Sequence, residues 1–90
     1  MDDIYNKLEK LSEKLSGNPL GEKAKELLRA ISDKELKEIV LSDEKLKGWF
    51  DKDRAWFDNN NDNDNKKIIN EFLSKANAYS LLKKTNNDNY

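Results

Sequence analysis

The chain has 90 residues, of which 39% are charged and 36% hydrophobic, and its 17 basic and 18 acidic residues leave a net charge of −1. This length suits one domain with a modest core, and the balanced charge argues against a dedicated binder of nucleic acid or anionic membranes, which needs a clustered basic surface. Because the chain has no histidine or cysteine, imidazole-based triads, cysteine nucleophiles, disulfides and the usual zinc ligands are excluded.

The start of the chain and its hydropathy bear on where the protein acts. Asp2 and Asp3 stand where a secretory signal would carry lysines, and the longest purely aliphatic run is Ile39-Val40-Leu41. A bilayer span takes about 20 apolar residues. We therefore expect a cytoplasmic protein without a membrane segment.

Residues 2–16 form the first predicted element. Their apolar side chains recur at intervals of four, three and four residues, the spacing of one helix face. They are Ile4, Leu8, Leu11 and Leu15. After them, Gly17 supplies a left-handed stop, Asn18 an N-cap and Pro19 the first position of a new helix. We expect an amphipathic helix followed by a sharp break.

A second helix is predicted from Pro19 to about Ile31, where Ser32 ends it. Its apolar residues again share one face. They are Leu20, Ala24, Leu27, Leu28 and Ile31.

A ten-residue repeat comes next. Ile31-Ser-Asp-Lys-Glu-Leu-Lys-Glu-Ile-Val is answered by Leu41-Ser-Asp-Glu-Lys-Leu-Lys-Gly-Trp-Phe. Ser32 and Glu35 have the form of a capping box, and Ser42 repeats the capping hydroxyl. We expect two short helices, at about residues 33–41 and 43–50.

The aromatic stretch 46–57 holds both tryptophans and two of the three phenylalanines. A seven-residue echo runs through it, since Gly48-Trp49-Phe50-Asp51 is answered by Ala55-Trp56-Phe57-Asp58. On one continuous helix, Trp49 and Trp56 would share a face about 10 Å apart, flanked by Phe50 and Phe57. The result would be an aromatic ridge.

A bend in this stretch is the alternative. Gly48 costs about 1 kcal/mol in a helix interior, and Asp51 and Asp53 can each cap a new helix. The two Trp-Phe pairs would then point in different directions, and more of them would enter the core.

Residues 58–65 are all Asp or Asn, which predicts a loop, because these side chains compete with the backbone for hydrogen bonds. A last helix is expected after it, up to about Lys84. Its apolar residues are Ile68, Ile69, Phe72, Leu73, Ala76, Tyr79 and Leu82. The predicted fold is all-α: a compact bundle of four to five helices in one domain over residues 1–84, with a frayed polar tail at 85–90.

The loop also resembles an EF-hand in outline, because an oxygen-rich stretch leads to Glu-Phe at the start of a helix. With Glu71 as the last ligand, Asn60, Asp62 and Asp64 take the first three ligand positions, and the resemblance implies calcium binding. The sequence departs from the family where Asn60 replaces an aspartate, Asn65 the turn glycine and Lys67 an isoleucine. A solvated linker is the competing interpretation.

No constellation in the sequence indicates catalysis. Asp51, Asp53 and Asp58 lie near Glu44, but nothing predicts environments that would pull their pKa values apart, and helix capping accounts for them. No glycine-rich phosphate loop is present. We expect no enzyme activity and no cofactor.

The last predicted helix is rich in lysine and also carries Tyr79. Its basic residues are Lys66, Lys67, Lys75, Lys83 and Lys84. Weak nucleic-acid contact through this face is one interpretation, and an ordinary solvent-exposed lysine face is the other.

The aromatic stretch therefore carries the functional prediction. Aromatic residues dominate protein–protein hot spots, although a small domain also needs them for its own core. We expect a small non-catalytic protein–protein interaction module of the inhibitor, immunity or adaptor type. Its predicted partner-binding residues are Trp49, Phe50, Trp56 and Phe57. The alternatives are a calcium-responsive protein and a weak nucleic-acid binder.

Overall fold

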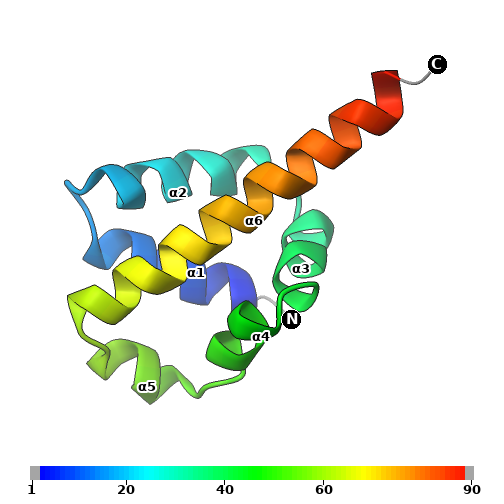
Figure 1. Cartoon of the computed structure of the whole chain (residues 1–90). Coiled ribbons are helices and arrows are strands. Elements are labelled where there is room, and N and C mark those ends of the chain that lie inside the picture. The colour runs from blue at the N-terminus through cyan, green and yellow to red at the C-terminus, as the bar shows by residue number, and fades with distance from the viewer. Residues whose placement is uncertain (1–2, 89–90) are drawn as a thin grey trace.

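The computed structural model describes the backbone of residues 3–88 and the side chains of residues 4–84, and this part of the chain is an all-α bundle. It contains six helices (Figure 1): α1 (Asp3–Lys14), α2 (Pro19–Ala30), α3 (Asp33–Leu41), α4 (Glu44–Phe50), α5 (Arg54–Asn59) and α6 (Asp62–Asp88). The predicted fold class is confirmed. None of these helices is long and apolar enough to cross a membrane.

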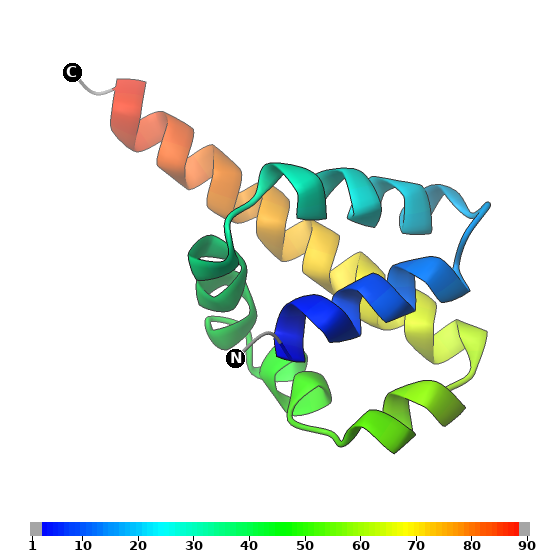
Figure 2. The ribbon, with the colours of Figure 1, turned by 180° about the vertical axis from the view of Figure 1, so that it is seen from behind.

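Helix α6 is the axis of the molecule. It crosses one face of the bundle, with α1 and α2 packed against it, α4 beside its first half, α3 farther along and α5 near its beginning (Figures 1 and 2). Its last turns project beyond the other helices, which contributes to the elongated shape of 47 × 26 × 19 Å. Helix α1 contacts α2, α3, α5 and α6.

One hydrophobic core joins all six helices, and it includes the predicted apolar stripes of α1 and α2 and that of α6 as far as Tyr79, whereas Leu82 was expected on this stripe but is 67% exposed. Its buried members are Leu8, Leu11, Leu15, Ala24, Leu28, Leu36, Ile39, Val40, Leu46, Phe50, Phe57, Ile68, Ile69, Phe72 and Ala76. Around it, the tryptophans and Tyr79 are only half-buried.

The break between α1 and α2 has the predicted chemistry. Gly17 has a φ of 88°, a conformation that costs glycine little because it has no Cβ. The Asn18 side chain accepts a hydrogen bond from the Leu20 amide at 3.0 Å, and Pro19 opens α2. Helix α1 ends at Lys14, two residues before the predicted limit, and residues 15–17 form the turn.

Helix α3 has the predicted bounds, but the cap of α4 was assigned to the wrong residue. The Ser32 hydroxyl accepts the Glu35 amide at 3.2 Å, as expected. Ser42 instead donates its hydroxyl hydrogen to the Ile39 carbonyl at 2.8 Å. Asp43 caps α4, because one of its carboxylate oxygens reaches two free amides of the first turn, at 2.9 and 3.1 Å.

The predicted loop at 58–65 is mostly helical, so this prediction was wrong. Residues 58 and 59 close α5, and only Asn60 and Asn61 separate it from α6. The Asn61 side chain accepts the Asp64 amide at 2.9 Å, which places Asp62 and Asp64 in the first turn of α6. Asp and Asn are unfavourable inside a helix but favourable at its cap and in its first turn, because the free amides and the positive end of the helix dipole there attract their side-chain oxygens.

At its other end, α6 continues through Thr85 to Asp88. The predicted start of a polar tail at residue 85 therefore falls within the helical backbone. Residues 89 and 90, the last of that tail, lie outside the described part of the chain.

Candidate functional site

The aromatic stretch is divided between two helices. Helix α4 ends at Phe50, and α5 begins at Arg54 after Asp53, whose carboxylate accepts the Trp56 amide at 2.8 Å. A ridge on one continuous helix is therefore wrong, and the bend foreseen as the alternative is what forms. Of the two aspartates expected to cap a new helix, only Asp53 does so, and Gly48 lies inside α4 without interrupting it.

The bend gives the phenylalanines and the tryptophans different roles. Phe50 and Phe57 are 5% and 2% exposed, and their rings stack 5.5 Å apart at 15°. Trp56 meets the edge of Phe57 at 5.0 Å and 86°, while Trp56 and Trp49 themselves stay half-buried at the edge of the core. Of the four predicted partner-binding residues, only the tryptophans reach the surface.

Two lysines of α1 bind backbone carbonyls of α4, α5 and the bend between them. The Lys7 ammonium donates to the carbonyls of Phe50 and Lys52 at 2.5 and 2.7 Å. The Lys14 ammonium donates to those of Phe57 and Asp58 at 2.5 and 2.8 Å. These carbonyls lie at or just beyond the C-terminal ends of α4 and α5, where free acceptors and the negative end of the dipole attract cations.

These lysines were not predicted from the sequence, although it contains a signal for them. Lys7 and Lys14 are seven residues apart, and so are Phe50 and Phe57, whose carbonyls they bind. The interval of the lysines on α1 therefore matches the interval of the aromatic echo. The two intervals match for a structural reason that the sequence does not show, which is that α1 contacts the middle of the chain.

A groove of about 630 Å³ lies between α4 and α6, with Trp49 in its wall. Lys45 and Glu71 form an ion pair across it at 3.8 Å. Lys52 also lines the groove, and its ammonium lies 6.0 Å from the Trp56 ring. Lys52 therefore lies near both tryptophans, and we call Trp49, Trp56 and Lys52 together the tryptophan corner.

The residues of the EF-hand-like outline do not form a ligand loop. Asp62 and Asp64 belong to the first turn of α6, and Glu71 lies farther along the same helix, paired with Lys45. Within the described part of the chain, no group of three or more acidic residues could hold a metal ion. A calcium loop needs oxygens converging from an irregular backbone, and a continuous helix directs them apart.

The lysines of α6 are partly committed to contacts within the molecule. Lys83 pairs with Glu35 of α3 at 2.7 Å, and the Tyr79 hydroxyl donates to Glu38 at 2.8 Å. The Lys83 ammonium, helped by the Ser32 hydroxyl, holds the pKa of Glu35 below its usual value. In turn Glu35 raises the pKa of Lys83, and Glu38 raises the pKa of Tyr79.

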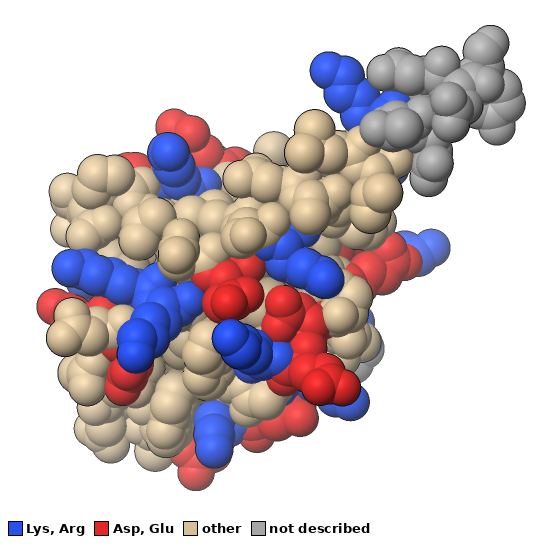
Figure 3. Space-filling view, in the orientation of Figure 1, with Lys and Arg blue, Asp and Glu red and all other residues tan. Residues whose placement is uncertain are grey.

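The surface charge is mixed. On the face shown in Figure 3, basic and acidic side chains are interspersed over the body of the molecule. Nucleic-acid binding through the lysines of α6 is therefore poorly supported, because phosphate backbones favour a continuous basic surface.

No protein-family model, curated protein or solved structure matches the chain. The described residues form an all-α bundle of six helices, whose α4 and α5 meet at a corner bearing two half-buried tryptophans.

Proposed function

We propose that this protein is a non-catalytic interaction module of the inhibitor, immunity or adaptor type, which binds a larger protein through the tryptophan corner. The supporting observation is that the two residues of each Trp-Phe pair differ in burial. Phe50 and Phe57 fill the core, so Trp49 and Trp56 are left half-buried at the surface with their ring positions fixed from below.

Such tryptophans suit a binding hot spot. They add large apolar area and lose little conformational freedom on binding, because the core already restrains them. Half-exposed aromatic residues surrounded by charged ones are the usual anatomy of a small recognition surface. Here the surrounding residues are Lys45, Lys52, Lys67 and Glu71. We also propose that the protein acts in the cytoplasm.

The test is affinity capture from a lysate of the source cells with wild-type protein and the double variant Trp49→Ala/Trp56→Ala. Leu82→Ala is the matched control, since Leu82 is 67% exposed and lies on the projecting end of α6, away from the corner. We expect one partner to be retained by the wild type and the control and lost with the double variant. Circular dichroism checks that all three proteins are folded.

Identical capture by the double variant would show that the tryptophans do not form the interface. Acrylamide quenching gives a second test. If the single tryptophan that remains is shielded from acrylamide in both Trp49→Phe and Trp56→Phe, the tryptophans do not form the interface. Loss of folding in the double variant is resolved by repeating capture with the single Trp→Phe variants, which keep the ring contacts of the core.

A further inference from the structure

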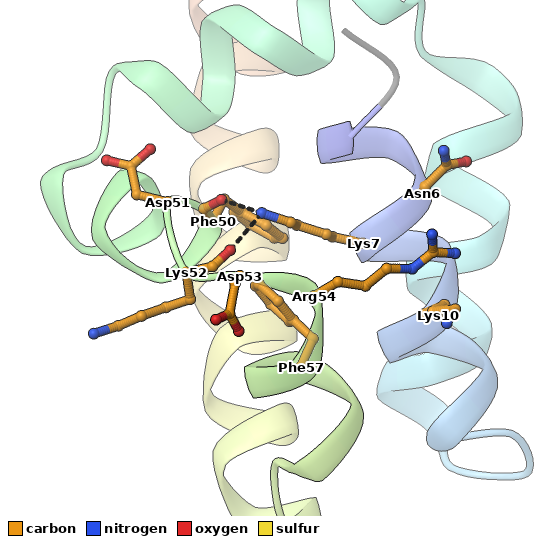
Figure 4. A pocket seen from close by; sticks show the side chains of 9 residues that line it. All are labelled: Asn6, Lys7, Lys10, Phe50, Asp51, Lys52, Asp53, Arg54 and Phe57. Atoms are coloured by element: carbon orange, nitrogen blue, oxygen red, sulfur yellow. Dashed lines mark hydrogen bonds between the residues drawn. The ribbon is translucent and has the colours of Figure 1, made fainter.

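A second cavity lies between α1 and the α4–α5 corner (Figure 4). Its volume is about 380 Å³, and the only residue it shares with the tryptophan corner is Lys52. Small-molecule sites in proteins start at roughly 300 Å³. Asn6, Lys7 and Lys10 line it from α1, while Phe50, Arg54 and Phe57 line it from the corner.

Lys7 brings a positive charge to the cavity that no carboxylate neutralises. Its ammonium binds two backbone carbonyls and lies 5.1 Å over the Phe57 ring. Carbonyls and a ring fix the position of the ammonium but leave its net charge in place. Two of its three hydrogens are used by the carbonyls, so one donor is free for a ligand.

Arg54 brings the second charge. Figure 4 shows its side chain reaching from the start of α5 toward α1, where it ends near Asn6 and Lys10. The guanidinium has no hydrogen bond or ion pair to any described residue. A guanidinium presents a planar set of donors that matches the two oxygens of a carboxylate or phosphate.

The acidic residues near the cavity cancel these charges only in part. Asp53 lines the cavity and keeps its negative charge while it accepts the Trp56 amide as the cap of α5, and Figure 4 shows Asp51 turned outward. Asp58 pairs with Lys10 at 3.3 Å. The side chain of Lys52 also points away from the cavity (Figure 4). Lys7 and Arg54 thus form a basic cleft beside the Phe57 ring.

We propose that this basic cleft binds a small organic anion whose carboxylate or phosphate is held by Arg54 and Lys7 and whose apolar body fits within the cavity of about 380 Å³. This site is separate from the tryptophan corner, so it does not depend on the proposed protein partner. The probes are benzoate and phenyl phosphate, with inorganic phosphate to test the anionic group alone and benzamide as a neutral control.

The experiment is a titration of isotopically labelled protein followed by NMR. We expect saturable shifts of the Arg54 side chain and of amides around residues 50–57 with benzoate or phenyl phosphate. Inorganic phosphate should bind more weakly, benzamide should give no saturable shifts, and added salt should weaken binding. Whichever probe binds more tightly identifies the anionic group as carboxylate or phosphate.

Two substitutions should act in opposite directions. Arg54→Gln removes the free guanidinium and should weaken binding by about tenfold or more. Asp58→Asn releases Lys10 and removes a competing charge, so binding should become several-fold tighter. Arg29→Gln changes the only other arginine, on α2, and should leave binding unchanged.

Absence of saturable shifts with either aromatic anion overturns the proposal. Equal affinity of the wild type and Arg54→Gln also overturns it, since binding would then be nonspecific. Thermal unfolding confirms that each variant is folded; Arg54 and Asp58 are both exposed.

Discussion

At the scale of single residues, two glycines in helices have opposite surroundings. A Cβ on Gly21 of α2 would lie 2.5 Å from the Leu15 carbonyl oxygen, whereas a Cβ on Gly48 of α4 would meet nothing within 4 Å. Gly21 therefore allows the backbone of α2 to approach the turn after α1. Gly48 serves no such approach and only weakens its helix.

Replacing each glycine by alanine should separate these roles. Gly21→Ala should lower the free energy of unfolding by about 1 to 3 kcal/mol, because the backbone contact must open. Gly48→Ala should raise it by about 1 kcal/mol, the difference in helix propensity. Urea unfolding followed by circular dichroism measures both. Equal stability of Gly21→Ala and the wild type would contradict the close approach.

The sequence predicts features that depend on nearby residues, such as helix caps, better than it predicts burial. Asn18 and Ser32 were identified as caps because a cap depends on neighbours within three residues. The Asp and Asn run was misread because the same residues favour loops, caps and first turns. Asn65 is fully buried, and its side-chain oxygen accepts a hydrogen bond from the side-chain nitrogen of Asn60 at 3.0 Å. Nothing local in the sequence distinguishes it from its exposed neighbours.

At the scale of helices, α3 and α6 are joined near the projecting end of α6 by a titratable contact, Lys83 with Glu35. The lowered pKa of Glu35 makes this contact stabilising above the usual carboxyl value of 4.5, and the stabilisation is lost as pH falls through the lowered value. The raised pKa of Lys83 makes it stabilising below 10.5, and this is lost as pH rises through the raised value. The pair therefore acts between these limits.

The pH dependence can be measured against Lys83→Met. The Tm of this variant should fall below that of the wild type by a small amount between about pH 5 and pH 10, because exposed pairs stabilise little. The difference should vanish in stronger acid and in stronger base. Lys84→Met, a change of the exposed neighbour, serves as the control and should show no such window. A difference independent of pH would assign the effect to packing instead.

At the scale of the whole molecule, α1 organises the middle of the chain. Lys7 and Lys14 each bind carbonyls more than 40 residues away along the sequence. The seven-residue interval on α1 thus fixes the spacing between the ends of α4 and α5. The sequence revealed the aromatic echo, but which ring of each pair turns inward depends on the bend and on α1, and both are set by tertiary contact.

Replacing these lysines should therefore loosen the corner. Lys7→Met and Lys14→Met should each lower the free energy of unfolding by about 1 to 2 kcal/mol, because each leaves two carbonyls without a charged donor. Lys10→Met loses only an exposed ion pair with Asp58 and should cost less than about 0.5 kcal/mol. Equal effects of all three in urea unfolding would contradict the capping role.

The position of α6 also has a consequence for synthesis of the protein. Ile68, Ile69, Phe72 and Ala76 of this last helix complete the core, and α6 contacts α1, α2, α3 and α4. A nascent chain that has emerged only through α5 can already pack α1 against α2, α3 and α5, but it leaves the side of the core that faces α6 open to water. The core is closed only after α6 has left the ribosome, and until then its apolar side chains can associate with other chains.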